Sequence, residues 1–385
     1  MICRVWYQNH IRKPFSFKTK RANELQIQIG DNMMKIKGFS ILIYLVLFSL
    51  VFFAAQAEAG SEKRRGTAGA MELLIPVGSR GTALGGSFNA SITGCEAIFW
   101  NPAGLAVSTA KAEVMASHFE YIAGINVAYA AAASKFDIGT IAISVKSLDF
   151  GDIPITTEAA PEGTGQSFSP TFITVGLTFS KQMTDRIAFG TTAKIISETI
   201  QNVSASGVAF DFGIQYIAGG TGLRLGIALK NIGPNMKFGG ADLETRLPPA
   251  GTEPGTRNSN LRTPLAAFEL PSTLELGLSY DMSMGENNAV TIAGNFMNHN
   301  FGFDTYGLSA EYGYNKWVFL RGGFVTGFNP GNSEFVSSDE EFLYGPSFGA
   351  GVNLNVGSFN VLLDYAYRST KFFNDNQWFT LSLVF

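Results

Sequence analysis

The feature that most constrains this chain is a two-residue alternation between apolar and polar side chains. Over residues 273–282, polar and small residues occupy one face and apolar residues the other: Leu274, Leu276, Leu278, Tyr280 and Met282. The same alternation recurs over residues 305–314, 358–368 and 379–385. Segments of about ten alternating residues, separated by turn signals, are typical of the strands of outer-membrane β-barrels.

A membrane helix and a soluble β-sandwich are the two rival structures for such a chain. Past residue 59 no uncharged apolar run approaches the roughly 18 residues that a membrane-spanning helix needs. A sandwich alternates in the same way, but three features favour the barrel. They are an export signal, the terminal Phe385 and aromatic residues near the expected strand ends: Tyr280, Tyr314, Trp317 and Trp378. We therefore expect an all-β fold, a transmembrane antiparallel β-barrel.

The export signal lies in residues 33–59. Residues 38–55 are uncharged and largely apolar, Lys35 and Lys37 precede them, and small residues follow. This order predicts a Sec signal peptide cleaved near Ala57 or Ala59, and the alternative is a permanent membrane anchor. Residues 1–32 are basic and patternless, so we interpret them as a gene-start extension, with translation beginning at Met33 or Met34. An extended n-region is the alternative.

The charge that remains after cleavage excludes some partners. Residues 60–385 contain 20 Lys and Arg against 28 Asp and Glu, a net charge of −8, which disfavours nucleic acid. Cys95 is the only cysteine in this part of the sequence, so neither an intramolecular disulfide nor a cysteine-based metal site is expected. We predict localisation in the bacterial outer membrane, with its lipid as the surrounding partner.

The barrel domain, residues 111–385, is expected to hold about 14 strands. We place them at 111–122, 125–135, 138–149, 168–181, 185–198, 203–218, 221–232, 270–282, 288–299, 303–314, 316–328, 345–356, 358–370 and 375–385. The three longest connections, 150–167, 233–269 and 329–344, all follow odd-numbered strands and so leave the barrel at one end. Because such barrels have long external loops and short periplasmic turns, we expect that end to face outward.

Residues 60–110 do not alternate and are rich in glycine. They contain the run Gly78-Ser79-Arg80-Gly81-Thr82-Ala83-Leu84-Gly85-Gly86-Ser87-Phe88 and then Trp100-Asn101-Pro102-Ala103-Gly104-Leu105. This pattern resembles the PorV/PorQ family of outer-membrane proteins, relatives of the FadL-type transporters of hydrophobic compounds. Weaker similar segments follow in family order at 210–213, 223–233, 274–280, 307–323 and 347–367. The chain departs from the family pattern where Cys95-Glu96 replaces the usual lead-in to the Trp-Asn-Pro turn.

The resemblance implies that residues 60–110 form a periplasmic or lumenal hatch inside the barrel. Its motif residues would be Gly78, Arg80, Gly85, Gly86, Trp100, Asn101, Pro102 and Gly104. We expect Gly85 and Gly86 to let backbone pack closely against the inner wall. Pro102 should hold Asn101 outside the helical region in a rigid turn. The alternative is a tight turn before the first strand with no gating role.

No motif for catalysis, a metal or a cofactor is found. His118 and His299 have no nucleophile motif around them, and Gly81–Gly86 lacks the context of a phosphate loop. Inward charges on the strands are the remaining candidates for a transport path, and the alternative is that they pair with one another or with the hatch. They are Arg224, Lys230, Glu275, Asp281, Glu311, Arg321, Asp364 and Arg368.

Two functions from different classes follow, and neither is enzymatic. By the resemblance, the chain takes part in type IX-like protein secretion and binds exported proteins through its external loops. The alternative is a FadL-like channel whose hatch gates passage of hydrophobic small molecules. An apolar cavity between hatch and wall would favour transport, whereas a packed lumen with exposed apolar loops would favour partner binding.

Overall fold

The computed structural model describes residues 64–247, 251, 259–329, 331, 334–336 and 342–385. The chain divides into two compact units, Met1–Glu58 and Ala59–Phe385, and every described residue belongs to the second. The predicted extension over 1–32, the signal peptide over 33–59 and its cleavage site therefore lie outside the described residues. Within the described residues, no helix is both long and apolar enough to cross a membrane.

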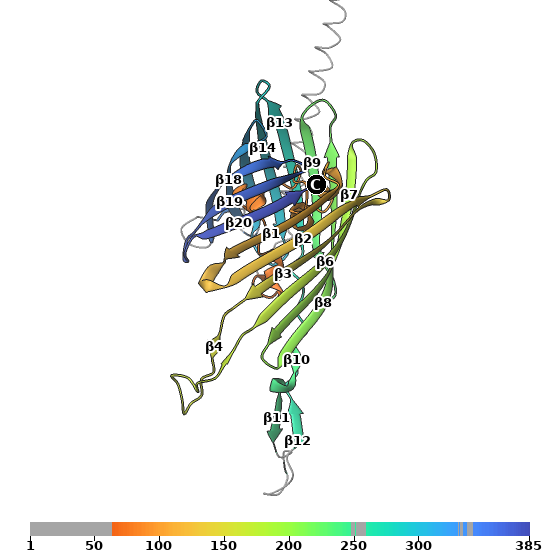
Figure 1. Cartoon of the computed structure of the whole chain (residues 1–385). Coiled ribbons are helices and arrows are strands. Elements are labelled where there is room, and N and C mark those ends of the chain that lie inside the picture. Colours follow the sequence, from red (N-terminus) through yellow and green to blue (C-terminus); the bar gives the residue numbers. More distant parts are fainter. Residues whose placement is uncertain (1–63, 248–250, 252–258, 330, 332–333, 337–341) are drawn as a thin grey trace, which may run out of the picture. The chain divides into compact units, whose positions relative to one another are not determined.

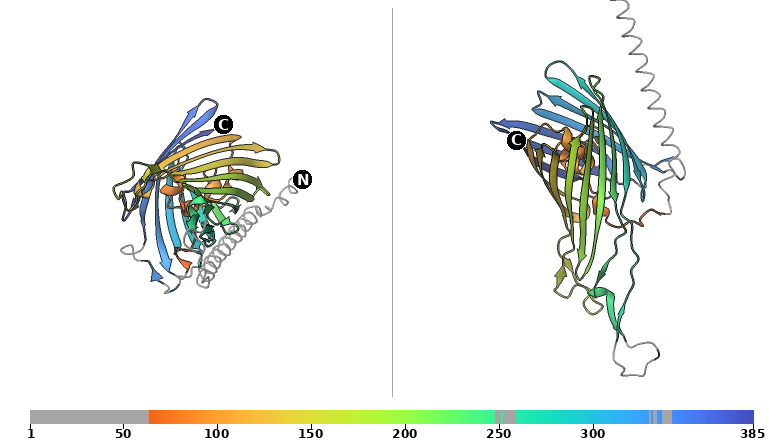
Figure 2. Two further views of the ribbon diagram at one scale, coloured as in Figure 1. Left: turned by 90° about the horizontal axis from the view of Figure 1, so that it is seen from below. Right: turned by 90° about the vertical axis from the view of Figure 1, so that its right-hand side faces the viewer.

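Among the described residues, fourteen long antiparallel strands form one sheet that closes on itself (Figures 1 and 2). β1 pairs with β20 as well as with β2, and β9 joins β8 to β13, so the ring has no open edge. The strands are β1 (Ala112–Glu120), β2 (Asn126–Phe136), β3 (Gly139–Asp149), β6 (Thr171–Gln182), β7 (Ile187–Ile200), β8 (Val203–Ile217), β9 (Leu223–Ile232), β13 (Thr273–Ser283), β14 (Asn288–His299), β15 (Asp304–Tyr314), β16 (Val318–Asn329), β18 (Tyr344–Val356), β19 (Phe359–Thr370) and β20 (Asn376–Val384).

This closed barrel confirms the predicted fold class. Each of the fourteen predicted strands is present, and the ends differ by three residues at most, where β6 begins at Thr171 and β13 at Thr273. Closure has a physical cause, because lipid offers no hydrogen-bond partner to the backbone groups of an open sheet edge.

The three longest connections, between β3 and β6, β9 and β13, and β16 and β18, leave the barrel at one end, here called the long-loop end. Two carry small sheets of their own, which extend beyond the barrel strands in Figure 1. These sheets pair β4 (Ile153–Pro154) with β5 (Ser167–Phe168) and β11 (Glu244–Leu247) with β12 (Ser259–Arg262). The other short elements outside the barrel strands are β10 (Gly239–Gly240), β17 (Glu334–Phe335), η3 (Ile122–Gly124) and η4 (Ala241–Leu243).

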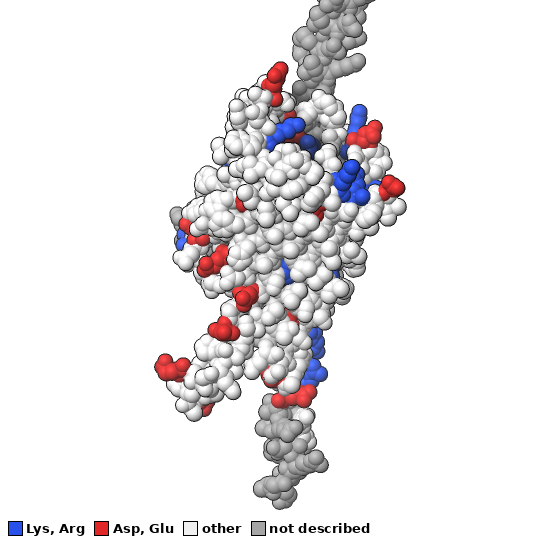
Figure 3. Space-filling view, in the orientation of Figure 1, with Lys and Arg blue, Asp and Glu red and all other residues white. Residues whose placement is uncertain are grey.

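The alternation separates an apolar outer face from a polar and small-residue inner face. Leu177, Ile195 and Leu308 point outward and are more than half exposed, whereas the residues beside them in each strand are buried. In Figure 3 few charged side chains lie over the middle of the visible wall. Trp378 lies near the start of β20, as expected, and it is fully buried on the inner face, where it stacks on Phe119.

Residues 64–110, here called the inner segment, lie inside the barrel. The segment contains η2 (Met71–Leu74), α2 (Ser79–Ala83), α3 (Ala97–Trp100) and α4 (Gly104–Val107), all short, joined by glycine-rich turns. A large apolar core lies between this segment and the inner face of β1, β2 and β3. Its wall members include Met115, Tyr129 and Ala131, and its inner-segment members include Ile98 and Phe99.

Candidate functional site

Glycines on the inner wall provide the surface against which the inner segment packs. A Cβ at Gly190 would lie 2.3 Å from the carbonyl carbon of Pro102, and one at Gly213 would lie 2.1 Å from Oδ1 of Asn101. No side chain fits at such distances, so glycine is required for this approach. Seven strands contribute such glycines: Gly190 (β7), Gly213 (β8), Gly226 (β9), Gly277 (β13), Gly307 (β15), Gly323 (β16) and Gly349 (β18).

The Trp-Asn-Pro turn seats one part of the inner segment on β8 and β9. Asn101 has φ −155° and ψ 103°, which confirms that the residue before Pro102 is held outside the helical region. Its Nδ2 donates to the carbonyls of Asn89 (3.1 Å) and Ile214 (3.2 Å), and Ala103 N donates to its Oδ1 at 3.2 Å. One amide side chain thus satisfies backbone groups of both the segment and the wall.

The remaining motif glycines allow tight contacts that a side chain would prevent. Gly78 (φ 81°), Gly85 (φ 61°) and Gly86 (φ 74°) have left-handed backbone conformations. Gly85 lies against Val325 of β16, as expected, but the missing side chain of Gly86 faces Trp100 within the segment and not the wall. At Gly104 a Cβ would lie 2.1 Å from the carbonyl oxygen of Ile92. Trp100 itself donates from Nε1 to the carbonyl of Val77 at 3.1 Å.

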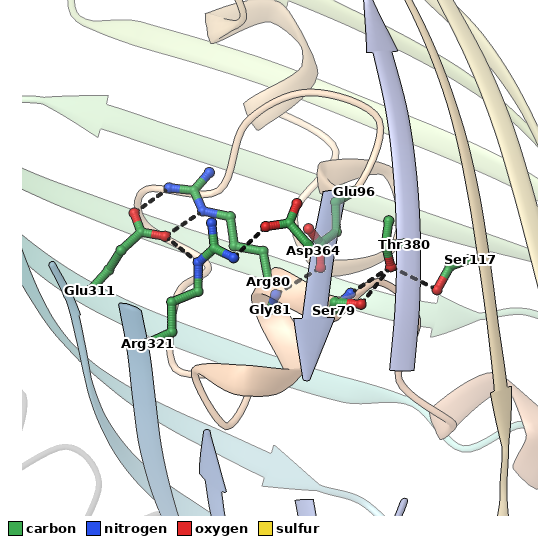
Figure 4. A network of polar contacts seen from close by, with 9 residues as sticks. All are labelled: Ser79, Arg80, Gly81, Glu96, Ser117, Glu311, Arg321, Asp364 and Thr380. Carbon is green, nitrogen blue, oxygen red and sulfur yellow. Dashed lines mark hydrogen bonds and ion pairs between the residues drawn. The ribbon is translucent and has the colours of Figure 1, made fainter. Parts of the chain in front are cut away.

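A network of charged side chains ties α2 to the strands β15, β16 and β19 (Figure 4). Arg80 donates to both carboxylate oxygens of Glu311 on β15, at 2.9 and 2.8 Å. Arg321 of β16 donates from Nε to Glu311 at 2.6 Å and from Nη1 to Asp364 of β19. Two guanidinium groups therefore share two carboxylates across the segment–wall contact, a bidentate arrangement that fixes geometry as well as charge.

A hydroxyl chain continues this contact toward β20 and β1. Ser79 donates from its backbone N to Oγ1 of Thr380 at 2.9 Å, and Oγ1 of Thr380 lies 2.9 Å from Oγ of Ser117 (Figure 4). The Oγ of Ser79 also lies 2.7 Å from Oγ1 of Thr380. These bonds place the start of α2 directly against the seam where the barrel closes.

Glu96 is a buried acid inside the segment, beside this network. Its carboxylate accepts a hydrogen bond from Gly81 N at 2.7 Å. Burial raises the pKa of Glu96 to about 7, because the charged form loses its hydration. The Gly81 hydrogen bond opposes this shift. Burial therefore favours the protonated form of Glu96 up to about neutral pH.

A second charged cluster lies on β7, β8, β9 and β13. Lys230 pairs with Glu275 at 2.5 Å, and Lys194 pairs with Asp211 at 2.5 Å. A register shift in the β8–β9 pairing sets Lys230 and Asn231 together opposite Asp211, and both are buried on the inner face. Such a bulge re-aims side chains, here Lys230 toward Glu275 and Asn231 toward Lys194, which donates to it at 2.8 Å.

The other inward charges predicted from the sequence occupy two separate places. Arg368 is 7% exposed, and its guanidinium lies 3.8 Å above the ring of Tyr344. Arg224 and Asp281 pair at 2.8 Å with side chains about 30% exposed, near the short turns. The eight predicted charges therefore form pairs or ring contacts with one another, with the wall or with Arg80, and they do not form one continuous line.

Sequence reasoning missed the inward residues Lys146, Lys194 and Asp211, and the acids Glu72 and Glu198. The signal was available, because Lys146 and Lys194 alternate with outward Ile and Val residues and so fall on the inner face. Within the described residues, no group of three His, Cys, Asp or Glu side chains is arranged to hold a metal ion. His118 lies outward, whereas His299 lies at the end of β14 and interacts electrostatically with Lys230.

The start of the inner segment is held by the loops of the long-loop end. Arg64 pairs with Glu269 at 2.6 Å and lies 4.5 Å from the ring centre of Phe301. Gly69 N donates to the carbonyl of Glu269 at 3.1 Å. Ala70 and Leu73 pack in an apolar cluster with residues of the β9–β13 loop, Met236 and Leu270. This part of the segment therefore contacts loops as well as the wall.

No protein-family model and no curated protein matches this chain. Among solved structures, it is similar to the monoaromatic hydrocarbon channel CymD (TM-score 0.48, 14% identity, 80% of this chain and 97% of that one). It is also similar to the Pseudomonas putida toluene transporter TodX (0.49, 12%, 80% and 97%) and to a Pseudomonas aeruginosa FadL homologue (0.44, 12%, 81% and 98%). At these values the likeness carries no conclusion about ligand or mechanism. The PorV/PorQ resemblance stays a prediction.

Proposed function

We propose that this chain is an outer-membrane channel in which the inner segment gates the passage of a hydrophobic small molecule. One observation carries the proposal: the inner segment fills the lumen without being part of the barrel sheet. Its bonds to the wall strands involve side chains such as those of Asn101, Arg80 and Ser79. The ring of fourteen strands is closed by its own ladder, so the segment can shift while the barrel stays intact.

The apolar preference follows from what the segment covers. Along β1 and β2 the inner wall presents Met115, Phe119, Val127 and small alanines, with Glu113 and Ser117 as the polar members of β1, whereas the charged clusters lie on the other strands. Displacement of the segment from β1 and β2 would expose an apolar strip running along the lumen. An uncharged apolar molecule gives up little hydration when it leaves water. An apolar strip can therefore accept it without having to replace lost hydrogen bonds.

The test is a disulfide that locks the segment to the wall. Cysteines replacing Ser79 and Thr380, whose hydroxyl oxygens lie 2.7 Å apart, would join α2 to β20 in a Cys95→Ala background. We expect oxidised protein in proteoliposomes to lose uptake of radiolabelled toluene at least tenfold, and reduction to restore it. Toluene serves as an uncharged hydrophobic probe and radiolabelled glucose as the polar comparison.

A matched control joins two wall strands and leaves the segment free. Thr178 of β6 and Thr192 of β7 have hydroxyl oxygens 2.8 Å apart, so cysteines at these positions would cross-link the barrel alone. This variant should transport equally well oxidised and reduced. If the locked Ser79–Thr380 variant transports as fast as the control, gating by the inner segment is wrong.

Protein export is the second candidate, as the PorV/PorQ resemblance implies. One observation favours it: the long-loop end carries the β4–β5 and β11–β12 hairpins beyond the barrel wall, where partner contacts commonly form. Isolation of the chain from its native outer membrane, followed by mass spectrometry, tests this candidate. A secreted protein held in stoichiometric amount would support export, and lipids or small hydrophobes alone would support the channel.

A further inference from the structure

Lys146 of β3 is a buried cation without a carboxylate partner. Its side chain points into the lumen and the residue is 5% exposed. The other two lysines of the lumen, Lys194 and Lys230, each pair with a carboxylate at 2.5 Å. Among the described residues, no carboxylate lies within ion-pair distance of Lys146. A buried charge without a counter-charge costs several kcal/mol, so this position calls for an explanation.

The contacts that Lys146 does make leave one donor unused. Its Nζ donates to the carbonyls of Glu72 (2.5 Å) and Ile75 (3.2 Å), and it lies 5.0 Å from the ring centre of Phe99. An ammonium has three protons to donate and accepts none. The nearest acid, Glu72, shares a hydrogen bond with Glu198 of β7 and interacts with Lys146 only electrostatically, from beyond ion-pair distance.

A small cavity lies directly beside this ammonium. It has a volume of about 30 Å³, and its sides come from both the inner segment and the wall. Because one water needs about 10–15 Å³, the cavity has room for roughly two particles of the size of water. Its lining includes apolar groups of the segment (Leu73, Ile98 and Phe99) and polar groups of the wall (Tyr129, Ser144, Lys146, Thr174, Thr192 and Lys194).

Two hydroxyls line this cavity without a hydrogen-bond partner of ordinary geometry. They are Oγ1 of Thr174 and the phenol of Tyr129, which lies beside the hydroxyl of Ser144. The residues are 7% and 6% exposed. Together with the ammonium groups they make a cavity surrounded by donors, and buried donors are normally satisfied by a ligand or water.

We infer that this cavity is a binding site for a small monovalent anion of the size of chloride, which serves as the counter-ion of Lys146. The anion accepts from the free Lys146 proton and from the Thr174 and Tyr129 hydroxyls. Its position also has a structural consequence. It lies between the inner segment at Leu73 and Phe99 and the strands β2, β3 and β6, so its binding fastens the segment to the wall.

Two measurements test the site on the full mature chain in detergent. Crystals soaked in sodium bromide should give an anomalous bromine peak between Lys146 Nζ and the Thr174 hydroxyl. In solution, replacing sodium gluconate by sodium bromide at equal ionic strength should raise the Tm by about 5 °C, because an ion that binds only the folded state stabilises it.

Variants separate this site from general salt effects. Lys146→Met should abolish the bromide-specific rise, whereas Lys135→Met, the same change at an exposed lysine of β2, should keep it. If Lys146→Met does not fold, Thr174→Val serves in its place, since it retains the ammonium and removes one donor, and it should reduce the rise at least twofold. Water alone in the cavity, or no bromide-specific rise in the unmodified chain, would overturn the inference. Absence of the bromide-specific rise would mean that Lys146 is neutral in the folded protein and needs no counter-ion.

Discussion

Two parts of the inner segment are held in different ways. Residues 78–105 are buried against wall glycines and are fixed by the Asn101 amide, the Arg80–Glu311 pair and the Ser79–Thr380 bonds. Residues 64–70 depend more on the loops of the long-loop end, through an Arg64–Glu269 pair whose side chains are 39% and 52% exposed, whereas residues 72–75 also bind the wall through Lys146. Exposed ion pairs contribute little to stability, whereas buried and bidentate ones are costly to break.

The difference teaches where movement of the segment would begin. A region with exposed contacts opens locally at a low free energy, and a buried, fully bonded region opens only with much of its surroundings. We therefore expect residues 64–70 to detach first, at the long-loop end, while residues 78–105 stay seated. The predictions below test this order through hydrogen exchange, which reports the opening free energy of each part separately.

The largest effect is expected from Glu311→Gln. This change leaves Arg80 without an ion-pair partner and Arg321 paired with Asp364 alone, and breaking a buried ion pair from one side costs about 4 kcal/mol. Hydrogen exchange in residues 78–90 should accelerate by several hundredfold, with less change in residues 64–75. Glu286→Gln, at a short turn, is the control and should change neither region. Equal acceleration in both parts would mean that they are one unit.

Gly190→Ala comes next. The added Cβ would lie within 2.6 Å of three backbone atoms of Pro102 and Ala103, so either the segment or β7 must shift, at a cost of about 3 kcal/mol. Exchange should rise most around residues 100–106. Gly294→Ala is the matched control, because its Cβ meets only ordinary contacts at 3.5 Å or more. If the two variants behave alike, the glycine contacts do not hold the segment.

A change of pH should alter the opening free energy of residues 78–105 through Glu96. Its pKa is raised to about 7 in the folded protein, so the protonated form is favoured there. Its stabilising contribution is fully present below the unfolded pKa and is lost as pH rises through 7. Between pH 5 and pH 8 the opening free energy of residues 78–105 should fall by about 2 kcal/mol. Glu96→Gln should remove most of this dependence, and a pH profile unchanged in that variant would assign the effect to another group.

The barrel was predictable from sequence because its signal is local. Alternation fixes which residues face outward, and turn residues mark strand ends. The predicted ends of the fourteen strands therefore agree with the structure to within three residues. The same parity rule would have placed Lys146, Lys194 and Trp378 on the inner face. Trp378 shows the limit of the other signal, because nearness to a strand end does not say which face of the strand a residue occupies.

The seating of the inner segment was only partly predictable. Gly85 against the wall and Asn101 outside the helical region follow from backbone sterics, which depend on neighbours in sequence. The pairing of Arg80 with Glu311, 231 residues away, depends on strand order and register around the whole ring, which no local pattern encodes. The bulge in β9 consists of Lys230 and Asn231, so no glycine or proline marks its position in the sequence.

The smallest effect is expected from Arg64→Ala at the start of the inner segment. The Arg64–Glu269 pair is exposed, so its loss should cost less than about 1 kcal/mol, and the ring contact with Phe301 adds little more. Exchange of residues 69–75 should accelerate about threefold while residues 78–105 keep their protection, because the apolar cluster around Leu73 and Met236 remains. In Arg64→Lys, which keeps the charge, the exchange rate of residues 69–75 should lie between those of Arg64→Ala and of the unmodified chain. If Arg64→Ala instead releases residues 78–105 as Glu311→Gln does, opening is not ordered from the long-loop end, and the exposed start of the segment controls the buried part.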